Sequence, residues 1–133
     1  MVGNGPRARI EETAPRMKIG TRKVEDVRIV DISGQIVLGQ ETGLLRNAVH
    51  DLVSQGEKKI ILNLAEVSYI DSSGLGELIA SYTTVRNQGG QLKLLNLSKK
   101  VHDLLLITKL YTIFDVKENE YLAIKSFDWF FAK

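Results

Sequence analysis

Apolar residues recur along the chain with two different spacings, which predict strands and helices in turn. Two Val- and Ile-rich segments, residues 17–24 and 27–37, are typical of neighbouring strands. Residues 44–53 instead place their apolar side chains at the spacing of one helix face. Gly56 follows at the position where a helix commonly ends with a residue in the left-handed region. The first half of the domain is therefore expected to contain two strands followed by a helix.

The alternation continues through the second half of the chain. Residues 58–64 are apolar on both faces, which favours a central strand of a parallel sheet. Helical spacing returns over residues 75–85 and stops at Gly89-Gly90. The remaining expected elements are strands over residues 91–97 and 113–116 and helices over residues 98–108 and 119–133. Strands that alternate with helices predict an α/β domain with a mainly parallel sheet.

The first 16 residues lack any such periodicity. They hold both prolines, Pro6 and Pro15, together with mixed charges. We interpret residues 1–16 as a flexible extension and residues 17–133 as one folded domain. A chain of 133 residues is long enough to bury a single sizeable core.

Composition narrows the class of protein further. Hydrophobic residues make up 44% and charged residues 26% of the chain, as in ordinary soluble domains. A formal net charge of +2 is too small to indicate nucleic-acid binding. The absence of cysteine excludes disulfides and thiolate metal sites. Neither a secretory signal nor an apolar stretch of about 18 residues is present, so we expect a cytoplasmic protein that is not embedded in a membrane.

The segment YIDSSGLG, residues 69–76, lies at the junction between an expected strand and an expected helix. Functional sites of open α/β sheets form at such junctions. No phosphate-binding loop of the form G-x-x-x-x-G-K-[ST] is present, and Ile79 occupies the third glycine position of a dinucleotide fingerprint. The serines also lack the flanking glycines of a nucleophile elbow. His50 and His102 each precede an aspartate on an expected helix and are interpreted as solvated. The chain is therefore not expected to be an enzyme.

Two interpretations of Asp71, Ser72 and Ser73 remain open from the residues themselves. Asp and Ser are preferred helix N-caps, with Gly74 and Gly76 permitting close packing or a tight turn. Alternatively, a serine at the helix N-terminus is a site that accepts a phosphate. Backbone N–H groups there accommodate an anion, and modification would add about −1.5 to −2 charges.

The sequence resembles the STAS domain of bacterial anti-sigma factor antagonists. The resemblance runs from about Val24 to Phe127 and rests on VRIVDISGQI, IILNL, VSYIDSSGLG, GGQLKLLNLS and LLLITKLYTIFDV in this order. It implies an α/β fold with a four- or five-stranded mixed sheet and helices mainly on one face. Members of the family are binding modules that need no cofactor, since ATP belongs to the partner kinase.

The resemblance also implies a phospho-switch. The second serine of the family's DSSG motif, Ser73 here, is phosphorylated by an anti-sigma factor that is a GHKL-type serine kinase. The unmodified form sequesters this kinase and releases a sigma factor, and a PP2C-type phosphatase restores the modified form. The implied partner-binding residues are Asp71, Ser72, Ser73, Gly74, Leu75 and Gly76.

One segment departs from the family pattern. Where members often read G-x-L-D, this chain has Gly34-Gln35-Ile36-Val37 and therefore lacks the acid. This segment is expected to lie near Ser73. The alternative function within the family is a STAS module of another assembly, such as a phospholipid transporter or a stress-signalling scaffold. The aromatic C-terminal segment FDWFFAK is expected to cover an edge of the core, or else to form an interaction patch.

Overall fold

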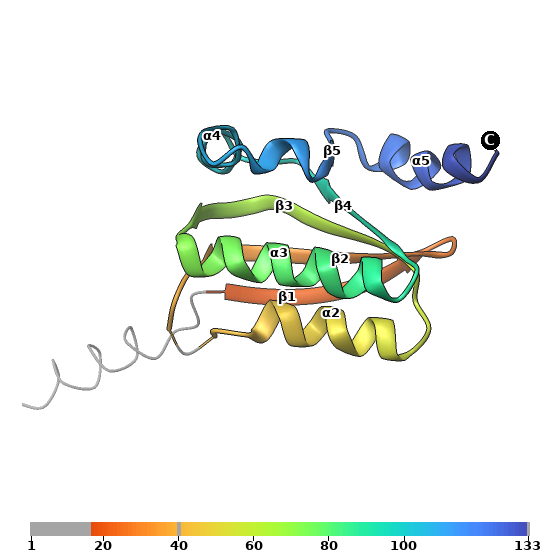
Figure 1. Ribbon diagram of the computed structural model, residues 1–133, viewed down its shortest axis with the longest axis horizontal. Helices are drawn as coiled ribbons and strands as arrows, with labels where there is room; N and C mark the ends of the chain where they lie inside the picture. Colours follow the sequence, from red (N-terminus) through yellow and green to blue (C-terminus); the bar gives the residue numbers. More distant parts are fainter. Residues whose placement is uncertain (1–16, 40, 133) are drawn as a thin grey trace, which may run out of the picture.

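The computed structural model describes residues 17–39 and 41–132, with side chains described as far as Phe127. Its centre is a five-stranded sheet with the strands in the order β1-β2-β3-β4-β5 (Figure 1). The strands are β1 (Met17–Val24), β2 (Val27–Ile36), β3 (Lys59–Ile70), β4 (Gln91–Leu95) and β5 (Asp115–Lys117). The first pair, β1 and β2, is antiparallel, and every later pair is parallel. The expected mixed sheet is confirmed.

A two-residue turn joins β1 to β2 and sets their register. Val24 pairs with Val27, and Glu25 adopts a positive φ of 57° to close the turn. The expected central strand is also confirmed, because β3 lies third of five. It continues to Ile70, beyond the apolar run that ends at Leu64, with two register shifts in its pairing with β2.

The helices are α2 (Leu44–Ser54), α3 (Ser72–Asn87), α4 (Lys99–Ile107) and α5 (Glu120–Ala132), with a short 3-10 turn η1 (Leu110–Thr112). Gly56 and Gly89 follow α2 and α3 with φ values of 91° and 82°, as their position predicts. The 3-10 turn was not predicted. Three residues are too few to carry a periodic signal.

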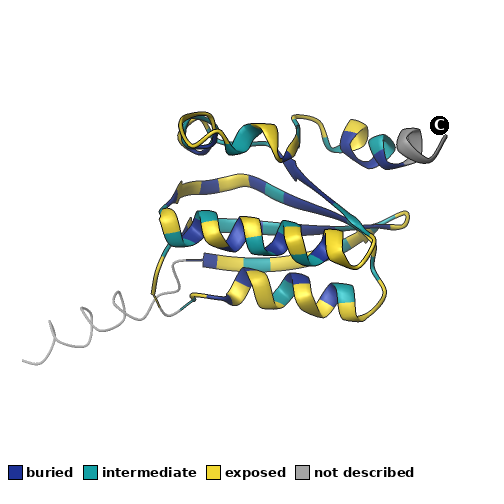
Figure 2. Cartoon of the chain, viewed as in Figure 1, coloured by how far each residue is buried: buried dark blue, intermediate teal, exposed yellow. Residues whose placement is uncertain are grey.

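The two faces of the sheet are covered unequally. α2, α3 and α4 pack on one face, where alternate residues of β2, β3 and β4 meet them in the larger core. Figure 1 shows α2 and α3 running side by side across this face. In Figure 2 the buried positions lie along the inner strands and recur along α2 and α3. Helices therefore lie mainly on one face, as the resemblance implies.

α5 covers part of the opposite face. Its Ala123, Ile124 and Phe127 form a second, smaller core with Ile29 and Ile61, among others. The expectation that the C-terminal aromatics cover a core edge is confirmed for Phe127, while the side chains of residues 128–133 lie outside the described part. The extension expected over residues 1–16 also lies outside it.

Candidate functional site

The N-terminus of α3 is built around Asp71. Asp71 has an extended backbone (φ −97°, ψ −172°) and is the N-cap of the helix. Its Oδ1 accepts a hydrogen bond from the Gly74 backbone N–H at 2.9 Å, and its carbonyl accepts from Leu75 N–H at 2.9 Å. The cap thereby satisfies donors that the first helical turn leaves without a partner. Of the residues considered for capping, Asp71 is the one that caps, so the serine side chains are not needed for it.

Asp71 also holds the loop that follows β2. Its Oδ2 accepts from Leu38 N–H at 3.1 Å, and its own N–H donates to the Ile36 carbonyl at 3.3 Å. Hydrogen bonds from Gly74 N–H and then Leu38 N–H stabilise the carboxylate and hold the pKa of Asp71 below its ordinary value. The segment that departs from the family pattern therefore lies against the start of α3, as expected.

Gly74 is required by the packing of this helix start. A Cβ at Gly74 would overlap the carbonyl oxygen of Ile36 and lie 2.6 Å from Cγ2 of Ile70. Gly76, by contrast, has open space where its Cβ would be. Close packing therefore explains the first glycine of the motif, and the structure supplies no steric reason for the second.

Ser72 and Ser73 are the first two residues of α3. Ser72 is exposed and Ser73 is half-buried. Within the described residues, neither hydroxyl has a hydrogen-bond partner. Both hydroxyls lie in the first turn, where the helix dipole favours negative charge. A phosphate on either one would therefore replace no hydrogen bond of the folded protein.

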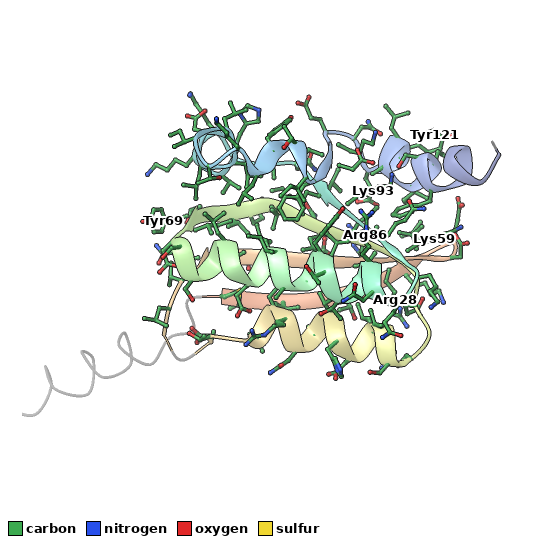
Figure 3. The ribbon with its side chains drawn as sticks, viewed as in Figure 1. Arg28, Lys59, Tyr69, Arg86, Lys93 and Tyr121 are labelled. Atoms are coloured by element: carbon green, nitrogen blue, oxygen red, sulfur yellow. The ribbon has the colours of Figure 1, made fainter. Side chains whose placement is uncertain are left out.

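Apolar side chains surround this helix start on the surface. Leu38 in the loop after β2 is 69% exposed, and Tyr69 near the end of β3 is 49% exposed. Figure 3 places Tyr69 at the end of the sheet where α3 begins. Leu75 is instead half-buried against the larger core. The surface beside the serines thus combines apolar contact area with one carboxylate.

Glu77, one turn beyond Ser73, is a buried residue of this region that sequence reasoning missed. Its side chain is 8% exposed, and its Oε1 accepts a hydrogen bond from Arg46 N–H in the first turn of α2 at 3.2 Å. The N-cap of α2 is Gly43, which has no side chain to cap the helix. Glu77 supplies that acceptor from α3 and so ties the two helices together. The sequence signal that could have revealed Glu77 is an acidic residue at a core-facing position of the expected helix.

The described residues contain no group of three or more metal-binding side chains. His50 is exposed, as interpreted from the sequence. His102 is half-buried, and its ring packs edge-to-face on Tyr111 with centroids 4.9 Å apart. Among the described helices, none is both long and apolar enough to cross a bilayer.

Comparison with known proteins agrees with this architecture. The family described as the STAS domain matches residues 18–123, most of the chain. The chain belongs to the STAS domain family. The match runs from the second residue of β1 through the other strands and through α2, α3 and α4, and it ends in the first turn of α5.

Curated relatives of this STAS chain bear directly on function. It is 40% identical over 87 residues to the anti-sigma-B factor antagonist of Bacillus subtilis, covering 65% of this chain and 78% of the relative. It is 27% identical over 99 residues to the anti-sigma F factor antagonist of Paenibacillus polymyxa, covering 74% and 84%. Both relatives are antagonists of anti-sigma factors.

Solved structures confirm the fold. The anti-sigma factor antagonist SpoIIAA in its unphosphorylated form superposes with a TM-score of 0.70 at 21% identity, covering 84% of this chain and 96% of that one. An anti-sigma factor antagonist from Mycobacterium paratuberculosis superposes with a TM-score of 0.72 at 19% identity, covering 85% and 96%.

Asp71, Ser72, Ser73, Gly74, Leu75 and Gly76 thus lie together at one helix start, as their sequence adjacency requires. Their assignment as a partner-binding site stays a prediction. The structure adds two residues that meet this segment from elsewhere in the chain, Ile36 and Leu38.

Proposed function

We propose that this protein is an anti-sigma factor antagonist whose binding is switched by phosphorylation of Ser73. The observation that carries the proposal is an unpartnered serine hydroxyl in the first turn of a helix that Asp71 already caps. The similarity to the Bacillus subtilis anti-sigma-B factor antagonist supports the same function.

The geometry allows phosphorylation without unfolding. Because Asp71 caps α3 through Gly74 N–H, the Ser73 hydroxyl does not hold the helix in place. A phosphate there lies near the positive end of the helix dipole, which favours negative charge. That SpoIIAA, a protein of the same fold, has been solved in a phosphorylated form supports the compatibility of the fold with this modification (TM-score 0.64).

The charge change provides the switch. Unmodified, the surface around Ser73 offers the exposed apolar side chains of Leu38 and Tyr69 to an anti-sigma factor. A phosphate would add about −1.5 to −2 charges beside the carboxylate of Asp71. A partner that buries this surface would then have to desolvate two adjacent anions, which opposes binding.

The proposed partners are those that the resemblance to anti-sigma factor antagonists implies. The anti-sigma factor is itself the serine kinase, of the GHKL type, and it supplies the ATP, so that this chain needs no cofactor. In the unmodified state the antagonist sequesters the kinase in the cytoplasm and releases the sigma factor. A PP2C-type phosphatase removes the phosphate and restores binding.

The proposal is tested by incubating the protein with its cognate kinase and ATP and locating phosphate by mass spectrometry. We expect one phosphate on Ser73 and none in Ser73→Ala. Ser72→Ala is the matched control, since it removes the adjacent hydroxyl, and it should still be phosphorylated. Phosphate on Ser72 alone, or on neither serine, would refute the assignment.

A further inference from the structure

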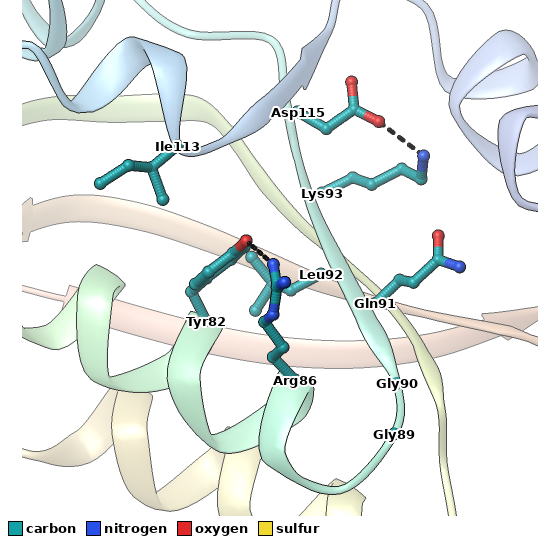
Figure 4. Close-up of a pocket in the computed structure, with 9 residues that line it drawn as sticks. All are labelled: Tyr82, Arg86, Gly89, Gly90, Gln91, Leu92, Lys93, Ile113 and Asp115. Atoms are coloured by element: carbon teal, nitrogen blue, oxygen red, sulfur yellow. Dashed lines mark hydrogen bonds and ion pairs between the residues drawn. The ribbon is translucent and has the colours of Figure 1, made fainter.

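A groove lies at the opposite end of α3, away from Ser73. It has a volume of about 470 Å³ and lies between the last turns of α3, the start of β4 and the segment leading into β5 (Figure 4). Ser73 and Arg86 are 13 residues apart, so at 1.5 Å per residue the groove is about 20 Å along the helix from the phosphorylation site. The proposed switch makes no use of this surface.

The walls of the groove are apolar and firmly placed. Tyr82, Leu92 and Ile113 contribute apolar surface to it. The Tyr82 ring packs edge-to-face on buried Phe114, with centroids 5.4 Å apart and planes at 76°. Ile113 is 46% exposed, although it is a large apolar side chain. The groove thus presents a preformed apolar surface to solvent.

Arg86 gives the groove an available positive charge. Its Nη1 donates to the Tyr82 hydroxyl at 2.7 Å, and its guanidinium carbon lies 5.9 Å from the centre of that ring. Within the described residues, Arg86 has no acidic partner. The other cation of the groove, Lys93, is paired with Asp115 at 2.6 Å. The groove therefore carries one uncompensated positive charge, held over an aromatic wall.

Lys58 adds positive charge at the rim. Its Nζ donates to the carbonyl of Gln88, at the end of α3. Among the described residues, Lys58 has no acidic partner. Its Nζ lies 3.9 Å from where a Cβ of Gly89 would stand, and Gly89 lines the groove. Charge complementarity therefore calls for an acidic occupant.

The first residues of β4, beside the groove, pair with β3 but not with β5. Gln91 N–H donates to the Lys58 carbonyl at 2.7 Å on the β3 side, so the N–H of Leu92 points to the other side of the strand. On that side β5 first pairs with β4 at Lys93 and Asp115. The Leu92 N–H thus points to the β5 side one residue before that pairing begins, and Leu92 lines the groove, so an extended chain in the groove can hydrogen-bond to it.

We propose that this groove binds an extended acidic segment of a partner protein. A carboxylate of the segment pairs with Arg86, and a neighbouring apolar side chain packs against Tyr82 and Ile113. A backbone carbonyl of the segment accepts from Leu92 N–H and extends the sheet edge by strand addition. Because the groove is distant from Ser73, this binding does not depend on the phosphorylation state.

The test uses a fluorescein-labelled peptide with the sequence Val-Glu-Val-Glu-Val-Glu and blocked ends. Its matched control is the same peptide with every Glu replaced by Gln. Titration of the full-length protein, followed by fluorescence anisotropy, should show saturable binding of the acidic peptide and at least tenfold weaker binding of the control. In amide NMR spectra the Leu92 signal should shift on binding.

Variants locate the site. Arg86→Glu should weaken binding at least tenfold. Lys18→Glu is the matched control, because it changes the net charge by the same amount on β1, the edge strand far from the groove. It should change the affinity for the peptide less than twofold. Ile113→Asp should also weaken binding at least tenfold, and it decides the question if Arg86→Glu does not fold. Ser73→Glu should bind the peptide as wild type does.

Three outcomes would overturn the proposal. The first is no saturable binding of the acidic peptide, and the second is binding to both Arg86→Glu and Ile113→Asp as tight as to wild type. The third is a shift of the Leu92 signal by acetate or inorganic phosphate, at the same concentration, as large as the shift by the peptide. The last result would make the groove a small-anion site rather than a docking site for a chain segment.

Discussion

The two ends of α3 differ in how tightly the fold constrains them. At the N-terminal end, Asp71 hydrogen-bonds to two segments, and Gly74 has no room for a side chain. At the C-terminal end, Arg86 is exposed and contacts Tyr82 of its own helix. Figure 3 shows the two ends on opposite sides of the domain, marked by Tyr69 and Arg86. One helix thus carries a tightly constrained start beside Ser73, the proposed phosphorylation site, and an exposed cationic side chain near its end.

Gly74→Ala should produce the largest loss of stability. The added methyl would overlap the Ile36 carbonyl and press on Ile70, so α3 must shift away from the sheet. We expect the free energy of unfolding to fall by about 3 kcal/mol, measured by urea denaturation.

Gly76→Ala is the matched control for that change, two residues along the same helix. It adds the same methyl group in open space, and alanine is the better helix former. We expect a gain of about 0.5–1 kcal/mol. Equal losses for Gly74→Ala and Gly76→Ala would show that the close contact at Ile36 does not constrain this end.

Asp71→Asn should have the next largest effect and should alter the pH dependence of stability. The pKa of Asp71 is lowered in the folded protein by hydrogen bonds from Gly74 and Leu38, so its ionised form favours folding. That stabilisation is present above the unfolded-state pKa, about 3.8, and is lost as the pH falls through the lower folded-state pKa.

The measurement is the thermal midpoint of both proteins between pH 2 and pH 7. We expect the variant to have a lower midpoint than wild type at pH 7 and to approach wild type at pH 2. Parallel curves for the two proteins would argue against a stabilising carboxylate at the helix start.

Arg86→Gln should change stability by less than about 0.5 kcal/mol, because its side chain is exposed and has no acidic partner among the described residues. Urea denaturation checks this value. A loss above 1 kcal/mol would mean that Arg86 contributes to folding stability, and it would contradict the difference between the two ends of α3.

Ser73→Glu should have the smallest effect on folding. Negative charge near a helix N-terminus is favourable, while Asp71 and Glu77 nearby oppose it, so the two contributions offset each other. We expect the free energy of unfolding to stay within about 0.5 kcal/mol of wild type. A larger loss would indicate that phosphorylation acts by disrupting the helix rather than by repelling a partner.

The sequence predicted elements wherever the apolar pattern was regular. The central position of β3 followed from its apolar residues on both faces, and Gly56 and Gly89 marked real helix ends. The extension of β3 to Ile70 was less visible. Beyond Leu64 its buried residues, Val67 and Ile70, recur every third position, because the pairing with β2 shifts register there.

The site was predictable as a segment but not as a three-dimensional arrangement. Asp71 and the two serines stand out by residue type, and a helix start after a strand follows from the pattern. The different roles of Gly74 and Gly76 depend on Ile36, which is distant in the chain, so no local pattern reveals them. The same holds for Glu77, whose acceptor role depends on how α2 packs against α3.

The most direct test of the central claim is the affinity of the cognate kinase–anti-sigma factor for three forms of this protein, measured by calorimetry. We predict that wild type and Ser73→Ala bind equally well and that the protein phosphorylated on Ser73 binds at least 100-fold more weakly. All three forms should unfold at similar urea concentrations. Equal affinity of the phosphorylated and unmodified proteins would contradict a switch at Ser73.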